Sequence, residues 1–206
     1  MARFVSTDSV FEGNWTSYNE EAGLYMGDSP HADSVVRNNW SDHNGFGIFL
    51  RDSTEITASH NTVWGNCIGI LALNSGDRAP GDLPAGDYRI VHSTAWANDR
   101  ACPASEDEGQ PPLSGMGIAL AGVHDTVVEK NVVRANVPGG DTLVSGGILI
   151  ISTADTGGAD PIDNVIRHNT LRDNEPADIV WDGTGSGNQV THNKCQTAIP
   201  ANLGWC

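Results

Sequence analysis

Residues 39–50 read Asn-Trp-Ser-Asp-His-Asn-Gly-Phe-Gly-Ile-Phe-Leu, and residues 61–72 read Asn-Thr-Val-Trp-Gly-Asn-Cys-Ile-Gly-Ile-Leu-Ala. In both stretches, two Asn residues five positions apart are followed by a Gly and alternating apolar residues. An apolar run with a period of two and only about four or five residues is typical of a β-strand and too short for a helix. The likeness of the two stretches indicates a chain built from repeats.

The Asn pairs set the length of the repeat. Two pairs keep the spacing with one substitution each, Ser93/Asn98 and Asn193/Ala198. The first members of successive pairs are 22 to 38 residues apart, so the shortest interval is one coil and the longer ones contain insertions. The complete pairs are Asn14/Asn19, Asn39/Asn44, Asn61/Asn66, Asn131/Asn136 and Asn169/Asn174.

Each repeat has room for three short strands. One precedes the first Asn (Thr57-Ala58), one lies between the two Asn residues (Thr62-Val63-Trp64), and one begins at a Gly (Gly69-Ile70-Leu71). Three short strands in about 22 residues are the unit of a parallel β-helix. The sequence therefore predicts one all-β domain over residues 1–206, a right-handed parallel β-helix of about seven coils. We expect an incomplete first coil at residues 1–21 and a tail at 199–206 that covers the last coil.

The repeated Asn residues have a structural explanation. Stacked coils bring equivalent residues to about 4.8 Å, the spacing of neighbouring strands, so an Asn at a bend can bond to the Asn above and below it. The sequons at Asn14 and Asn39 are then not expected to be glycosylated, because ladder side chains point inward. The expected ladder residues are Asn39, Asn61, Asn131, Asn169 and Asn193 in one column and Asn44, Asn66, Asn98, Asn136 and Asn174 in the other.

The same register pairs the four cysteines. Cys67 and Cys102 fall in neighbouring coils, and Cys195 in the last coil can bond to Cys206 at the end of the tail. Both disulfides favour an oxidising, secreted setting.

Charge restricts the partners. The formal net charge is −15, with 11 Lys and Arg residues, so nucleic acid and anionic membranes are unfavourable partners. No motif indicates a cofactor. Calcium is a weak alternative, because Asp77, Asp82, Asp87 and the run Glu106-Asp107-Glu108 cluster in insertions, where solvated loop charge is the simpler explanation.

Two columns of outward residues could form a binding strip. The residue before the first Asn is His60, His92, Lys130 or His168 in four coils, and the residue three positions after it is Trp64, Trp96, Arg134 or Arg172. His60, Trp64 and Trp96 are predicted to bind substrate, since Trp rings stack on sugars. Cationic groups can pair with uronate carboxylates, and a base could remove the C5 proton. The alternative is ordinary solvated bend residues. The predicted catalytic residues are His92, Lys130, Arg134, His168 and Arg172.

A third outward column is apolar, which is unusual for exposed surface. Three covers are possible: the insertions 74–87, 99–114 and 137–145, a ligand, or a second subunit that associates through Tyr25, Phe49, Leu71 and Leu149. The column consists of Tyr25, Phe49, Leu71, Ala119, Leu149 and Val180.

Three stretches carry a family resemblance: Gly-Leu-Tyr-Met-Gly-Asp-Ser-Pro-His (23–31), Gly-Phe-Gly-Ile-Phe-Leu-Arg (45–51) and Trp-Asp-Gly-Thr-Gly-Ser-Gly-Asn (181–188). The chain resembles the secreted right-handed parallel β-helix repeat proteins of actinobacteria, which are labelled pectin-lyase-like or NosD-like. Relatives on this scaffold include polysaccharide lyases, polygalacturonases and alginate C5-epimerases. Such epimerases carry an Asp-Pro-His motif, whereas this chain has Ser29-Pro30-His31 with Asp28 displaced, so epimerase activity is not carried over.

Two functions follow as hypotheses. The first is a secreted protein that binds or processes an acidic polysaccharide in a lyase-, hydrolase- or epimerase-like way. The second is a non-catalytic structural or adhesion module that uses the apolar column to contact a protein partner.

Overall fold

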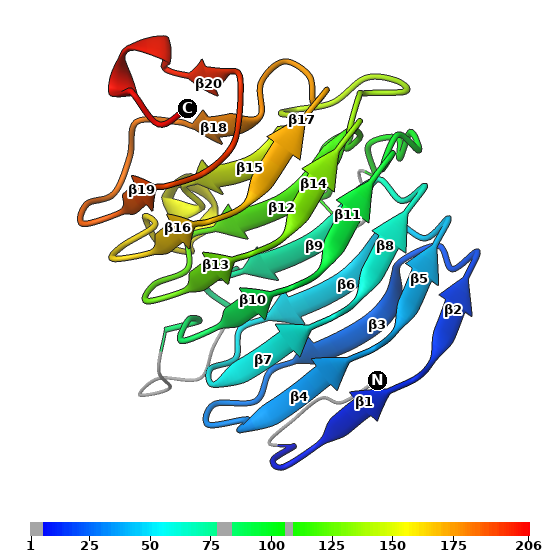
Figure 1. Cartoon of the computed structure of the whole chain (residues 1–206). Helices are drawn as coiled ribbons and strands as arrows, with labels where there is room; N and C mark the ends of the chain where they lie inside the picture. The colour runs from blue at the N-terminus through cyan, green and yellow to red at the C-terminus, as the bar shows by residue number, and fades with distance from the viewer. Residues whose placement is uncertain (1–5, 78–83, 106–108) are drawn as a thin grey trace.

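The chain winds through three parallel sheets, as Figure 1 shows. The computed structural model describes residues 6–77, 84–105 and 109–206. Each strand pairs in parallel with the equivalent strand of the next coil, so the chain passes through all three sheets once per coil. The predicted all-β parallel β-helix is confirmed. Sheets of seven, six and seven strands agree with the expected number of coils.

In chain order, each coil contributes one strand to each sheet, except that the last coil, with β19 and β20, has no strand in the second sheet. The two short 3₁₀ helices η1 (Ala154–Thr156) and η2 (Ala201–Leu203) lie outside the sheets. The first sheet contains β1 (Val10–Glu12), β4 (Ser34–Arg37), β7 (Ile56–Ser59), β10 (Arg89–Val91), β13 (Val127–Glu129), β16 (Val165–Arg167) and β19 (Gln189–Thr191). The second sheet contains β2 (Trp15–Ser17), β5 (Trp40–Asp42), β8 (Thr62–Trp64), β11 (Thr94–Trp96), β14 (Val132–Arg134) and β17 (Thr170–Arg172). The third sheet contains β3 (Ala22–Gly27), β6 (Phe46–Arg51), β9 (Ile68–Leu73), β12 (Met116–Ala121), β15 (Gly146–Ile151), β18 (Ile179–Trp181) and β20 (Ala198–Ile199). In the first coil, β1, β2 and β3 pair with β4, β5 and β6.

The predicted Asn ladders fill the two bends around the second sheet. The Asn66 side-chain amide donates to Asn98 Oδ1 at 3.0 Å, and the Asn98 amide donates to Asn136 Oδ1 at 2.8 Å. The same carbonyls also accept from backbone N–H groups of the preceding coil. Where the sequence has Ser93, its hydroxyl accepts from the Asn61 backbone N–H at 3.2 Å. The ladders therefore satisfy buried polar groups that the short bends would otherwise leave unpaired.

A third, shorter ladder lies at the bend between the third sheet and the first. Asn164 Oδ1 accepts from the Thr126 backbone N–H at 2.9 Å, and the Asn164 amide donates to Asn188 Oδ1 at 2.9 Å. The sequence did not reveal this ladder, because insertions of different length precede the bend and Asn is present in only the last coils.

The apolar outward column of the third sheet is covered. Tyr25, Phe49 and Leu71 are each less than a tenth exposed, and they form a second apolar cluster outside the helix interior. Leu113 and Val144, from the insertions 99–114 and 137–145, pack against it. Cover by the chain's own loops therefore accounts for the column. Because these side chains are buried, little exposed surface remains for a second subunit to contact. The residues expected to contact it are Tyr25, Phe49, Leu71 and Leu149.

The two predicted disulfides are present. Cys67 is bonded to Cys102, and Cys195 to Cys206. The second bond ties the tail to the last coil, where Trp205 packs against the helix interior and against Trp181 at 5.7 Å between ring centroids.

The Asn98→Ala substitution tests the ladder. Two donors of Asn66 then lose their acceptor, so we expect the free energy of unfolding to fall by about 2–4 kcal/mol. Asn98→Ser is the matched control, because Ser93 serves the same function in the neighbouring column, and its loss should be about half as large. Urea denaturation followed by circular dichroism measures both. Equal stability of Asn98→Ala and the wild type would contradict a stabilising ladder.

Candidate functional site

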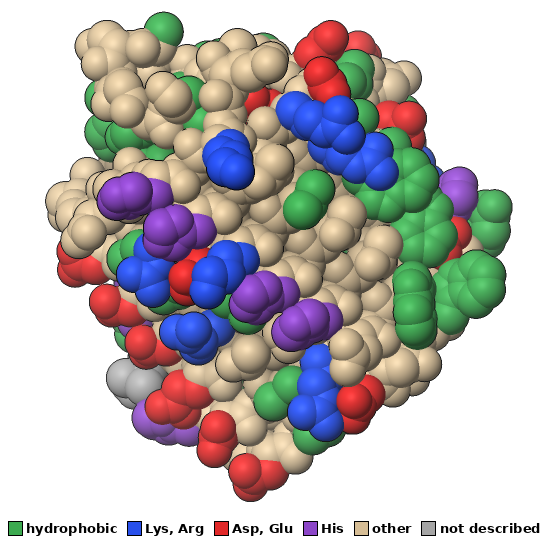
Figure 2. Space-filling view, viewed as in Figure 1, with side chains coloured by type: hydrophobic (Ala, Val, Ile, Leu, Met, Phe, Trp, Pro, Cys, Tyr) green, Lys and Arg blue, Asp and Glu red, His purple; other side chains and the backbone are tan. Residues whose placement is uncertain are grey.

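The outward face of the first and second sheets concentrates positive charge. Figure 2 shows Lys, Arg and His side chains running across this face. From the coil of β10 to the last coil it carries six of the protein's eleven Lys and Arg residues, against a net charge of −15 for the whole chain. We call this surface the cationic face. Its six cations are Arg89, Lys130, Arg134, Arg167, Arg172 and Lys194.

Glu129 is the carboxylate at the centre of these cations. It lies 3.2 Å from Arg167 and 3.5 Å from Lys130. Burial raises the pKa of Glu129, but the hydrogen bond from Arg167 and the charges of Arg167 and Lys130 lower the pKa more, so that the net pKa is below its usual value. The carboxylate therefore stays ionised and holds two long cationic side chains in place.

The His column has a backbone explanation as well as a surface position. His60, His92 and His168 sit at bends with φ of 53° to 56°, in the left-handed region. His tolerates this region better than most residues, so the bend itself accounts for part of the repetition. The rings nevertheless lie in pairs, with His60 and His92 stacked at 5.1 Å and His168 and His192 at 5.3 Å between centroids.

Trp64 and Trp96 stack on each other rather than standing apart. Their ring centroids are 6.0 Å apart with planes 11° from parallel, and the Arg134 guanidinium lies 5.0 Å from the Trp96 ring. The Trp96 ring therefore lies between Trp64 and Arg134, which limits the area that it can offer to a sugar.

The structure brings the predicted strip together. His60, His92, Lys130 and His168 follow the ends of successive strands of the first sheet, and the Trp and Arg residues end successive strands of the second. Among the described residues, no hydrogen bond joins two of the predicted catalytic groups. None of them is therefore oriented as a base by another. Their binding and catalytic roles stay predictions.

Three exposed aromatic residues of the second sheet escaped the sequence interpretation. Trp15 and Tyr18 are 74% and 76% exposed, and Trp40 is 49% exposed. Trp15 and Trp40 lie at the first position of β2 and β5, whereas the predicted strip uses the last position of the equivalent strands. The sequence feature that could have identified them is the Asn-Trp pair, which occurs at both 14–15 and 39–40.

Asp42 is a buried carboxylate beneath these aromatic residues. It accepts hydrogen bonds from Trp15 Nε1 at 2.6 Å and Ser17 Oγ at 3.0 Å, and its Oδ2 lies 2.6 Å from His43 Nδ1. Burial raises the pKa of Asp42, but hydrogen bonds from His43, Trp15 and Ser17 together lower it below its usual range. The carboxylate is thus kept ionised by the groups that it orients.

A second cluster of ionisable groups lies at the ends of β3 and β6. Tyr25 Oη donates to Asp28 Oδ2 at 3.0 Å, and the Arg51 guanidinium donates to Asp52 at 3.0 Å and to Asp77 at 3.3 Å. Burial lowers the pKa of Arg51, but Asp52, Tyr25 and Asp28 raise it above its ordinary value. The cluster places a hydroxyl, carboxylates and a guanidinium side by side. Asp28 thus faces a Tyr, a contact that motif comparison alone could not show.

The acidic residues weighed for calcium do not converge in the described part of the chain. Asp77 pairs with Arg51, while Asp82 and Glu106, Asp107 and Glu108 lie outside the described residues. No group of three His, Cys, Asp or Glu residues suited to a metal ion occurs in residues 6–77, 84–105 and 109–206. Within the same ranges, no helix is long and apolar enough to cross a membrane.

Comparison with known proteins agrees with the fold. A family model described as right handed beta helix region matches residues 3–80. The A-modules of the Azotobacter vinelandii mannuronan C-5 epimerases AlgE4 and AlgE6 are similar in structure, with TM-scores of 0.56 and 0.58 and identities of 19% and 18%. The matches cover 91% and 92% of this chain but 55% and 54% of those structures, so this chain spans about half their length. No curated protein sequence gives a significant match. The protein is an all-β right-handed parallel β-helix.

Asp42→Asn should destabilise the protein in a pH-dependent way. Because the pKa of Asp42 is lowered by folding, its stabilisation is present above about pH 4 and is lost as the pH falls through the lower folded-state value. We expect a loss of about 1–2 kcal/mol at pH 7 that shrinks as the pH falls below about 4. Asp173→Asn, at an exposed carboxylate, is the control. A difference between wild type and Asp42→Asn that does not change with pH in urea titrations would contradict this account.

Proposed function

We propose that the protein is a secreted β-helix that binds an acidic polysaccharide along its cationic face. The observation that carries the proposal is the concentration of six cations on one face of a chain with a net charge of −15. A protein this acidic repels polyanions over most of its surface, so a polyanion that binds must do so at a local positive patch. The two disulfides favour secretion.

The spacing of the cations supports a linear ligand. Arg134 and Arg172 occupy equivalent positions of successive coils, which are about 4.8 Å apart, and Lys130 lies in the same coil as Arg134. A polymer that lies along the helix axis therefore meets Arg134 and Lys130 in one coil and Arg172 in the next. Arg can pair with a carboxylate through two parallel hydrogen bonds, which suits uronate groups.

Removing two of these charges tests the proposal. The double substitution Arg134→Gln and Arg172→Gln should weaken uronan binding about five- to thirtyfold, if each exposed charge pair contributes about 0.5–1 kcal/mol. Affinity electrophoresis in gels containing alginate or pectate, with titration calorimetry at several salt concentrations, measures the change. The variant should also show a smaller dependence of affinity on salt.

Arg37→Gln is the control. Arg37 lies outside the cationic face and pairs with Glu12 at 2.8 Å, closer than the 3.7 Å between Arg172 and Asp173, so its loss should leave binding nearly unchanged. The proposal fails if the wild type binds none of several uronans, or if Arg37→Gln weakens binding as much as the double variant.

A second candidate function is modification of the bound uronan. The observation that favours it is the cluster of Tyr25, Asp28 and Arg51, together with the likeness in fold to mannuronan C-5 epimerase modules. In such a reaction Arg51 would pair with the uronate carboxylate. The Asp28 carboxylate, which the Tyr25 hydroxyl contacts, would take the proton from one face of C5, and a solvent proton would be returned to the other face.

Tyr25→Phe tests this second candidate. Wild-type protein incubated with polymannuronate in deuterium oxide should incorporate deuterium at C5, which nuclear magnetic resonance detects, and Tyr25→Phe should reduce the rate by about 10²–10⁴-fold. Asp155→Asn, at an exposed carboxylate of η1 outside the cluster, should keep the wild-type rate. Absence of C5 exchange in the wild type would reject modification and leave the binding proposal in place.

A further inference from the structure

The exposed aromatic residues form a surface of their own beside the cationic face. Trp15 and Trp40 occupy equivalent positions of β2 and β5, and Tyr18 follows β2 at the adjacent bend. We call these three residues the aromatic platform. Trp and Tyr side chains exposed by half or more are uncommon as a group, and such a patch typically marks a binding surface.

The platform is held in place by a buried charge. Asp42 accepts from Trp15 Nε1, and its contact with His43 orients the imidazole. The Tyr18 ring stacks on His43 with centroids 4.8 Å apart and planes 15° from parallel. A buried carboxylate is unfavourable unless its hydrogen bonds are satisfied, and here they fix the polar edges of the rings. Most of the Trp15 and Tyr18 surface therefore stays in solvent in a defined orientation.

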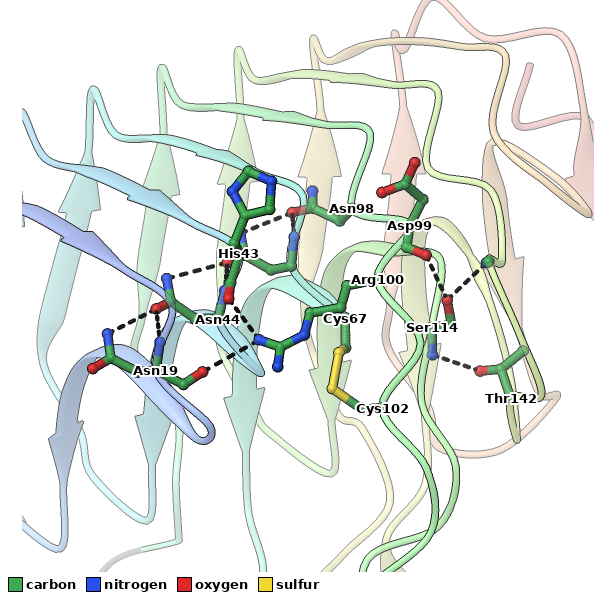
Figure 3. Close-up of a disulfide and its surroundings, with 12 residues drawn as sticks. Asn19, His43, Asn44, Cys67, Asn98, Asp99, Arg100, Cys102, Ser114 and Thr142 are labelled. Atoms are coloured by element: carbon green, nitrogen blue, oxygen red, sulfur yellow. Dashed lines mark hydrogen bonds between the residues drawn. A yellow bond between two sulfur atoms is a disulfide. The ribbon is translucent and has the colours of Figure 1, made fainter.

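The backbone behind the platform is also anchored. Arg100 donates to the carbonyl oxygens of His43 at 2.5 Å and Asn19 at 3.3 Å. The disulfide between Cys67 and Cys102 ties down the segment that carries Arg100, as Figure 3 shows. The bends that bear Tyr18 and His43 are thus joined to the insertion 99–114. Anchoring of this kind reduces the entropy lost when a ligand binds.

We propose that the aromatic platform is a sugar-stacking site that takes pyranose rings of the same polysaccharide whose carboxylates contact the cationic face. The inference rests on the proposed function and assigns the uncharged part of the recognition to Trp15, Tyr18 and Trp40. The ligand class is a uronan long enough to span both surfaces.

Continuity and area favour a polysaccharide over a second copy of the chain. The platform and Arg134 lie on the same sheet, and four coil steps from β2 to β14 cover about 19 Å. Trp and Tyr bury roughly 150–250 Å² each, so three partly covered rings offer less than the about 800 Å² per partner that stable protein interfaces use. A flexible polymer can use such a small platform because its charged groups bind elsewhere.

The double substitution Trp15→Thr and Trp40→Thr tests the proposal. Thr occupies the equivalent position in β8, β11 and β17, so the variant keeps the local sheet pattern. We expect about tenfold weaker binding of long uronan chains, with an unchanged dependence of affinity on salt, because the lost contacts are uncharged. Val132→Thr is the matched control at the same position of β14 and should bind like the wild type.

The outcomes separate this inference from the proposed function. Wild-type affinity in the double Trp variant, with weaker binding in the double Arg variant, overturns the platform and leaves the proposed function standing. If the wild type binds no uronan, the proposed function fails. The platform is then tested by measuring the binding of cellohexaose, a neutral oligosaccharide, to the wild type and to the double Trp variant. Binding that the double Trp variant loses then supports a sugar site, and no binding overturns it. Light scattering that shows a dimer dissolved by the same variant also overturns it.

Discussion

The parallel stacking of coils is the constraint on which the rest of this structure depends. Because each strand pairs with the equivalent strand of the next coil, residues at equivalent positions of neighbouring coils lie about 4.8 Å apart. A polar group that turns inward must then be satisfied by the same position in the neighbouring coil, which Asn can do because it both donates and accepts. The ladders, the apolar interior and the stacked His and Trp rings all follow from this one repetition.

Repetition also limits what a repeated residue says about function. His recurs at one bend partly because the bend requires a left-handed backbone, and Trp64 and Trp96 use their ring faces on each other. Charge escapes this limit, because like charges in neighbouring coils repel one another and the ladder does not need them. The accumulation of Arg and Lys from the coil of β10 to the last coil is therefore the stronger functional signal. The exposed aromatic residues at the other end of the second sheet add to this functional signal.

The fold and the disulfides could be predicted because they depend on spacing. The Asn pairs five residues apart gave the register, and the register placed Cys67 beside Cys102. The site was harder to predict. Trp15 and Trp40 lie at the first position of their strands, outside the repeated column that contains Trp64 and Trp96. In the sequence, nothing distinguishes Asp42 from an ordinary polar bend residue. The contact between Tyr25 and Asp28 needed the turn after β3 to be in place, since a motif with a displaced carboxylate does not say where that carboxylate points.

The amino-acid sequence alone was enough to specify the coil, the inward and outward faces and the partners of the four cysteines, because all of these repeat with the period of the chain. The cover over Tyr25, Phe49 and Leu71 and the anchoring of the aromatic platform by Arg100 and Asp42 required the folded chain. These contacts come from insertions and diagonal neighbours that have no period, and their partners are set by how the loops pack rather than by their distance along the sequence.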